Sequence, residues 1–422
     1  MTNEGKQVPF GGSGYATDCR LFTGFSPCRH RRTCPGCPQY EPVDSRILLI
    51  QLDALGDVLR TTAVLPALRR AHPRAHLTWL TRREAAPLLE NNPLVDRVLV
   101  LGDATAAVLN TLQFDLALCP DKSIPAGSLM SLVVAQDKRG FGVDANGSIV
   151  PLNPEAEYLY RLGLDNEEKF FRNTRSEQQI VTETLGLEYR RDRYTIVLTD
   201  DERRHAREDR QVAGVEDDEV LIGWNTGCSP RYPYKQLDIP DQVELMHMTW
   251  DFLPRKDQVR FALLGGGIGD EERNKQIAAL LAERRVPSTR TPCLRGIRRG
   301  IAAAAACDMM VTGDTLALHL AIGLKKPVVV WFGITCHQEI ELYGRGVKVL
   351  SKVPCRPCWL QSCSMETKCF RELPWSTMAG AVAEMSETLL RDGVWEEERQ
   401  LGDFPPQNRV SPPVGISPGP IL

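Results

Sequence analysis

The chain lacks several features that would have assigned it to other classes of protein. It has no run of about 18 uncharged apolar residues, so we expect no membrane-spanning helix. It has no surplus of positive charge, because 51 Lys and Arg stand against 54 Asp and Glu, and this balance gives no reason to expect a nucleic-acid partner. No basic segment followed by an apolar run begins the chain, so we expect no secretory signal and a cytoplasmic location.

A dinucleotide-binding glycine pattern is also missing. The first buried run, RILLIQL (46–52), leads into a turn where G-x-G-x-x-G would be needed, and only Gly56 is present there. This disfavours a nicotinamide dehydrogenase. The residue that follows, Asp57, either supports the start of a helix through the helix dipole or contacts a ligand at the carboxyl end of the first strand.

Two series of strands alternating with helices are present, and 422 residues are enough for two domains. We therefore predict an α/β protein with two Rossmann-like domains whose parallel sheets face a cleft. We predict a Cys-rich extension at residues 1–44, a first domain at 45–200, a connection at 201–218 and a second domain at 219–375. A C-terminal helix is predicted at 376–402, and the Pro-rich residues 403–422 are expected to be disordered. The predicted strands are RILLIQL (46–52), HLTWLT (76–81), RVLVLG (97–102) and FDLALCP (114–120), then EVLIGWNT (219–226), VRFALLGG (259–266), DMMVTGD (308–314), PVVVWFG (327–333) and VKVLS (347–351).

A strand-to-helix turn in the second series has the composition of an anion site. The strand breaks at Gly313, and a helix starts at Asp314 or Thr315, where free backbone N–H groups attract negative charge. His319 lies one helical turn further on and faces the same side. The alternative is an ordinary N-cap pair followed by a half-buried histidine.

Two more strand ends carry residues suited to a nucleotide. Gly266 permits a close backbone approach, and Glu271 in the following acidic stretch suits ribose hydroxyls; equally, these residues form a flexible turn and complement a helix dipole. Asn225 and Thr226 end another strand. Lys235 follows ten residues after Asn225 and can neutralise a diphosphate, although most lysines are simply solvated.

Two sequence blocks resemble glycosyltransferase family 9, the ADP-heptose:lipopolysaccharide heptosyltransferases. The stretch ILLIQLDALGDVLRTTAVLPALRRAHPRAHLTWLTRREAAPLLENNPLVDRVL is similar to the opening of that family, and VTGDTLALHLAIGLKKPVVVWFG is similar to its D-T-x-x-x-H segment. The resemblance extends over about residues 45–390 and is looser from about 125 to 220. It implies a GT-B fold and inverting transfer from a nucleotide diphosphate sugar without a catalytic metal.

The resemblance also implies roles for particular residues. Asp57 is the general base, Lys235 contacts the phosphates, and Asp314, Thr315 and His319 contact the nucleotide sugar. Lys235 follows Tyr-Pro-Tyr here, whereas the family places its lysine next to Trp-Pro. The ribose-binding acid falls within residues 270–272, and Glu271 is the residue we assign.

The implied partners are a nucleotide-sugar donor, with ADP-heptose as the family expectation, and an acceptor hydroxyl on lipopolysaccharide core, another glycan, a lipid-linked acceptor or a protein. Peripheral association with the inner membrane and a homo-oligomer are both compatible with the family. Two alternatives remain: a GT-B nucleotide-sugar epimerase, for which we identify no additional carboxylates, and an inactive metal-thiolate scaffold or sensor that binds nucleotide. Asp57 beside Gly56 argues against the second.

Eight of the thirteen cysteines fall into two close sets, which in a cytoplasmic protein favour metal over disulfides. Four thiols with a C-x-x-C pair suit a tetrahedral zinc, iron or iron–sulfur site. Family 9 members often have a similar C-terminal cluster, and some bind iron. Unpaired thiols are the alternative for each set, and His30 can replace one thiol in the first. Because neither set lies on a strand end that carries the chemistry, we expect a structural metal. The sets are Cys19, Cys28, Cys34 and Cys37, and then Cys355, Cys358, Cys363 and Cys369.

Overall fold

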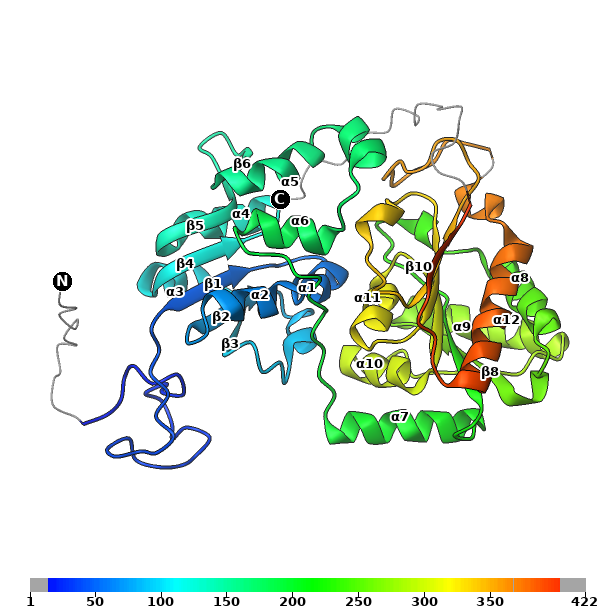
Figure 1. Ribbon diagram of the computed structural model, residues 1–422, viewed down its shortest axis with the longest axis horizontal. Coiled ribbons are helices and arrows are strands. Elements are labelled where there is room, and N and C mark those ends of the chain that lie inside the picture. Colours follow the sequence, from blue (N-terminus) through cyan, green and yellow to red (C-terminus); the bar gives the residue numbers. More distant parts are fainter. Residues whose placement is uncertain (1–13, 367, 403–422) are drawn as a thin grey trace.

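Buried apolar runs form the centres of two sheets. The computed structural model describes residues 14–366 and 368–402. Figure 1 shows two α/β bodies side by side, the first coloured blue to green and the second green to orange. The predicted pair of α/β domains is confirmed, and each of the nine predicted strands corresponds to a strand of the structure.

The first sheet has the strand order β3-β2-β1-β4-β5-β6, and its pairs are parallel except that of β5 with β6. β1 lies centrally because its apolar residues are buried on both faces. Its strands are β1 (Arg46–Ile50), β2 (His76–Thr81), β3 (Arg97–Val100), β4 (Gln113–Cys119), β5 (Val134–Val143) and β6 (Ile149–Pro151). Its helices are α1 (Leu55–Thr61), α2 (Val64–Ala71), α3 (Thr105–Thr111), α4 (Ile124–Leu132), α5 (Glu157–Leu162) and α6 (Glu177–Thr184).

The second sheet has seven described strands in the order β13-β12-β11-β10-β7-β8-β9, all paired in parallel. Its strands are β7 (Val220–Asn225), β8 (Val259–Leu264), β9 (Ser288–Arg290), β10 (Met309–Gly313), β11 (Val328–Phe332), β12 (Gly346–Leu350) and β13 (Glu398–Leu401). Its helices are α8 (Ile239–Phe252), α9 (Ile268–Glu283), α10 (Ile297–Ala306), α11 (Leu316–Gly323) and α12 (Trp375–Asp392).

The polar connection between the domains, predicted at 201–218, is a helix over most of its length. α7 (Asp200–Ala213) begins with a capping box, in which the hydroxyl of Thr199 accepts from the N–H of Glu202 and the carboxylate of Glu202 accepts from the N–H of Thr199. α7 packs against α10, where Arg299 pairs with Asp209. Ion pairs hold this helix to the second body because it has little apolar surface to bury.

The carboxyl-terminal segment differs from the single helix predicted over 376–402. α12 ends where Gly393 adopts a left-handed conformation, with φ 72°. The chain then returns as β13, which pairs with the outer strand β12. The predicted disorder of 403–422 lies outside the described residues.

The described part of the Cys-rich extension, residues 14–44, consists of turns with a single bridge between Cys19 and Pro42. Its attachment to the first body is polar, because Arg20 donates to the carboxylate of Asp96 and to the carbonyl of Ala75. In Figure 1 the segment lies away from the junction between the two bodies.

One buried apolar cluster continues from the first body into the second. It includes Ile47 and Leu59 from the first body, Leu318 and Ala321 from α11, and Tyr194 from the segment between the bodies. This shared core fixes α1 against α11 (Figure 1). Within residues 14–366 and 368–402, no helix is long and apolar enough to cross a membrane.

Candidate active site

The carboxyl ends of β1 and β10 meet where the two bodies join. At this point Gly56, in the first turn of α1, lies so close to α11 that an added Cβ would come within 2.7 Å of Cδ2 of His319. Only glycine fits this contact without displacing the histidine. The loops that carry Asp57 and Asp314 are thereby held on the two sides of one junction.

Asp57 is anchored and still open to solvent. Its Oδ2 accepts the N–H of Ala54 at 3.0 Å, and its Oδ1 lies 2.6 Å from the Arg60 guanidinium. Its side chain is 41% exposed, whereas that of Arg60 is 11% exposed. The same guanidinium nitrogen contacts Glu177 at 2.5 Å, so one arginine links α1 to the start of α6.

The charge of Arg60 is stabilised by these two carboxylates. Burial lowers the pKa of the Arg60 guanidinium, but Glu177 and Asp57 outweigh it, and the net effect is a raised pKa. A permanently charged group therefore sits beside Asp57. Sequence reasoning did not find Arg60 or Glu177, which lie 117 positions apart.

Asp121 holds the β1–α1 turn in shape and was also missed. Its Oδ2 accepts the N–H of Leu52 at 2.9 Å, and its Oδ1 accepts that of Ser123 at 2.9 Å. Burial raises the pKa of Asp121, although these backbone bonds oppose the shift. Asp121 follows β4, and β4 lies beside β1 in the sheet. A residue at the carboxyl end of a neighbouring parallel strand is expected near the β1–α1 turn, so this position could have indicated its role.

Lys235 and Asp314 form a largely buried ion pair on the second body. Nζ of Lys235 lies 3.3 Å from Oδ2 of Asp314, with side-chain exposures of 17% and 10%. Burial raises the pKa of Asp314, but the charge of Lys235 opposes this and the net pKa is lowered, so the carboxylate is ionised at neutral pH. The predicted phosphate-contacting lysine and the strand-end aspartate are thus brought together.

His319 is buried and uncharged at neutral pH. Burial and the nearby Arg60 lower its pKa to about 4. Its Nδ1 lies 3.2 Å from the Tyr194 hydroxyl, and the two rings stack with centroids 5.9 Å apart. His319 therefore acts at this junction as a neutral packing and hydrogen-bonding group.

The predicted residues at the ends of β7 and β10 form one polar network. Thr315 caps α11 by accepting the N–H of Ala317, and Asn225 donates to the Thr315 hydroxyl at 3.3 Å and to the Gly227 carbonyl at 2.7 Å. Thr226 is fully buried, and its hydroxyl bonds to Asn274 at 2.5 Å. The side chain of Thr226 thus makes a hydrogen bond inside the second body, whereas Asn225 and Thr315 border the junction.

Of the three acidic residues after β8, Asp270 lies nearest the strand ends. Its carboxylate accepts the N–H of Gly266 at 2.8 Å and lies where a Cβ on Gly227 would come within 2.0 Å of it. Glu271 instead pairs with Arg290 at 3.0 Å, and Glu272 pairs with Lys275 at 2.7 Å. The space beside Gly266 is open.

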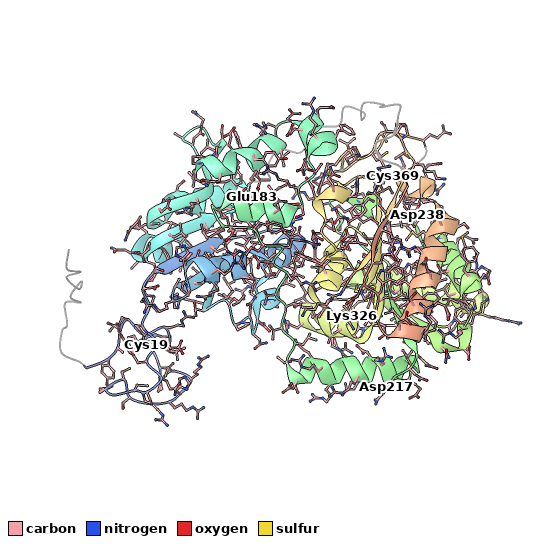
Figure 2. All side chains as sticks on the ribbon, in the orientation of Figure 1. Cys19, Glu183, Asp217, Asp238, Lys326 and Cys369 are labelled. Carbon is pink, nitrogen blue, oxygen red and sulfur yellow. The ribbon has the colours of Figure 1, made fainter. Side chains whose placement is uncertain are left out.

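Neither cysteine set is assembled as a metal site. Across the part of the chain that the structure describes, no three His, Cys, Asp or Glu side chains are arranged to hold a metal ion. Figure 2 shows Cys19 on the extension beside the first body and Cys369 on the second body, far from each other, so the two sets do not form one site. In the C-terminal set, Cys355 and Cys358 pack against the small apolar cluster that contains Cys369.

The C-terminal cysteine segment, residues 355–369, contacts a predicted site residue. Trp359 within it contacts Lys235, with Nζ 5.0 Å from the ring centroid. The expectation that this cysteine set has a structural role stays a prediction. Sequence reasoning missed the contact because Trp359 and Lys235 are far apart in the chain.

Two α/β bodies that meet at the carboxyl ends of their strands, with an open carboxylate on one side of the junction and a lysine beside a helix start on the other, have the architecture of the GT-B class. A family model described as glycosyltransferase family 9 (heptosyltransferase) matches residues 254–369. This match covers part of the chain, and together with the curated relative described below it supports a glycosyltransferase similar to family 9.

Relatives agree with this assignment. Lipopolysaccharide heptosyltransferase 1 of Campylobacter coli is 20% identical over 300 residues, which cover 69% of this chain and 84% of that protein. A family 9 glycosyltransferase structure from Veillonella parvula matches with a TM-score of 0.63 and 18% identity, covering 83% of this chain and 99% of that one. The structure of E. coli ADP-heptose lipopolysaccharide heptosyltransferase II matches with a TM-score of 0.58 and 17% identity, covering 82% and 99%. The two structures confirm the predicted GT-B fold.

Substituting Gly56 tests the junction. Gly56→Ala places a methyl group against His319, so we expect α1 and α11 to separate and unfolding stability to fall by about 1–3 kcal/mol. A misplacement of 1 Å can cost about 100-fold in rate, and we expect a loss of that order in sugar transfer. Initial rates and chemical denaturation measure the two effects.

The matched control is Gly380→Ala in α12, where the new methyl group would lie an ordinary 3.9 Å from Phe252. This variant should keep wild-type turnover. Unchanged transfer by Gly56→Ala would show that the contact with His319 does not position the site.

Proposed function

We propose that this glycosyltransferase takes a heptose from ADP-heptose and transfers it, with inversion, to a hydroxyl group of a glycan. The observation that carries the proposal is the meeting of Asp57 with Lys235, Asp314 and the start of α11 across one junction. The sugar and nucleotide are suggested by the relatives, since the C. coli protein is a lipopolysaccharide heptosyltransferase and the E. coli structure is an ADP-heptose enzyme.

The donor half is supplied by the second body. Lys235 neutralises the diphosphate, and the backbone N–H groups at the start of α11, which Thr315 caps, provide further donors for phosphate oxygens. These groups stabilise the charge that develops on the leaving ADP. Asp314 keeps Lys235 directed toward the junction until the donor arrives.

The acceptor half is supplied by the first body. Asp57 removes the proton of the acceptor hydroxyl while that oxygen attacks the anomeric carbon, and the bond from this carbon to the diphosphate breaks. Arg60 and the N–H of Ala54 each bind one oxygen of Asp57, which fixes the direction of the carboxylate. No metal takes part in these steps.

For the ribose we propose Asp270 in place of Glu271. The carboxylate of Asp270 lies against the glycines that end β7 and β8, whereas that of Glu271 is engaged by Arg290. A carboxylate at this edge of the sheet suits two ribose hydroxyls.

A polar hollow between the bodies favours a polyhydroxyl acceptor. This cavity of about 420 Å³ borders Ser176, which precedes the Arg60 partner Glu177, and contains Gln179, Tyr189 and Gln338 among its lining residues. Its charges are paired, as in Arg191–Glu341. Hydroxyl, amide and aromatic groups with little unpaired charge suit a sugar chain such as a lipopolysaccharide core.

The cytoplasmic location of the enzyme stays a prediction.

A donor panel tests this function. Purified protein is incubated with ADP-heptose, ADP-glucose, UDP-glucose and GDP-mannose, with and without a lipopolysaccharide-core acceptor. We expect ADP to be released from ADP-heptose and a heptosylated product by mass spectrometry. Epimerised donor without ADP release would favour the epimerase, and binding without turnover would favour the inactive scaffold.

The base assignment is tested by Asp57→Asn. Loss of a positioned base typically costs about 100- to 10,000-fold, so transfer should fall by that factor while ADP binding stays within about 2-fold of wild type. Asp53→Asn is the matched control, since Asp53 lies in the same turn but pairs with Arg82. Normal turnover by Asp57→Asn would exclude Asp57 as the base.

We propose that the C-terminal cysteine set binds a structural metal; the proposal rests on the spacing of the four thiols and on the packing of Cys355, Cys358 and Cys369 in one cluster. Wild-type protein should contain zinc or iron at about one atom per four thiols, and Cys355→Ser should lose it. Elemental analysis measures this, with Cys228→Ser as the control because the Cys228 thiol faces backbone carbonyls. Equal metal contents in wild type and Cys355→Ser would contradict the proposal.

A further inference from the structure

A single indole ring contacts one lysine from each body. Nζ of Lys235, from the second body, is 5.0 Å from the ring centroid of Trp359, and Nζ of Lys169, from the first body, is 4.4 Å from it. Both distances are within the range of a cation–π interaction, for which tryptophan is the best partner. Tyr232 packs edge-on against the same indole, with centroids 5.8 Å apart, and its ring is 5.5 Å from Lys235.

The cysteine segment holds this indole in place. The N–H groups of Cys358 and Trp359 both donate to the carbonyl of Ile334, at 3.1 and 2.8 Å. The indole N–H of Trp359 donates to Sγ of Cys336 at 3.3 Å. Both Ile334 and Cys336 follow β11, so the end of that strand sets the position of the ring.

Aromatic walls fix Lys235 without cancelling its charge. A carboxylate partner attracts an ammonium group but offsets its charge, whereas the face of a ring attracts it through the quadrupole and leaves the charge available. Lys235 has one carboxylate, Asp314, and two aromatic partners, Trp359 and Tyr232. This arrangement suits a lysine that must keep a positive charge for an incoming anion.

We propose that Trp359 is a positioning residue of the donor site, which holds the ammonium group of Lys235 where it meets the donor diphosphate. The inference rests on the proposed role of Lys235. Through Trp359 the cysteine segment determines donor affinity, so this segment is part of the binding machinery and not only a brace. Lys169, on the same ring, ties this arrangement to the first body and also lies 3.9 Å from Glu339.

The experiment measures nucleotide binding by calorimetry with ADP, UDP and GDP. Kd for the nucleotide that wild type binds is determined for Trp359→Leu, Trp359→Phe, Lys235→Met and the double variant Trp359→Leu/Lys235→Met. We expect Trp359→Leu to weaken binding by about 2- to 30-fold, with Trp359→Phe between it and wild type. In the Lys235→Met background, Trp359→Leu should have no further effect, since the two residues act as one unit.

Trp375→Leu is the matched control, because Trp375 lies at the start of α12 and its indole donates to the carbonyl of Arg371. It should bind nucleotide as wild type does. In turnover assays, Trp359→Leu should raise the KM for the donor more than it lowers kcat. Thermal melting checks folding; if the leucine variant does not fold, Trp359→Phe alone and combined with Lys235→Met completes the same cycle.

The outcomes distinguish a failure of the proposed donor site from a failure of the proposed role of Trp359. If Lys235→Met binds as tightly as wild type, or wild type binds none of the three nucleotides, the donor site itself is wrong and the inference falls with it. If Lys235→Met weakens binding but Trp359→Leu does not, or Trp359→Leu weakens it equally in both backgrounds, Trp359 does not act through Lys235 and the inference alone is overturned.

Discussion

The site depends on one steric constraint, the contact of a glycine with a histidine ring. Gly56 lies in the first turn of α1, His319 lies in α11, and a Cβ at position 56 would collide with the histidine ring. Because His319 is uncharged at neutral pH, the contact does not bury a charge.

Around the contact, charges are paired within each body. In the first body Arg60 lies between Asp57 and Glu177, and in the second body Lys235 lies beside Asp314. Burying such groups costs free energy unless each has a partner. An enzyme that must separate a proton acceptor from a leaving anion benefits from this division, because the base and the cation cannot neutralise each other.

Local patterns in the sequence were enough to predict the strands and the residues at their carboxyl ends. Apolar runs such as β1 and β10 are buried on both faces, so Asp57 and Asp314 follow directly from where those runs end. α7 was not predicted as a helix because it lacks an apolar stripe. Its Thr-x-x-Glu start is nevertheless the pattern of a capping box, which indicates a helix start. The contacts Arg60–Glu177 and Trp359–Lys235 could not be predicted, since each joins residues more than 100 positions apart and depends on how distant segments pack within one body.

The short strand β13 has a consequence for the behaviour of the whole molecule in solution. It is four residues long and covers one side of β12, whose backbone would otherwise offer a row of unpaired N–H and C=O groups. Such a row is a template on which a second chain can add a strand. β13 becomes the edge of the sheet in place of β12, and because it is short and carries Glu398 and Arg399, it is a poorer template for edge-to-edge aggregation.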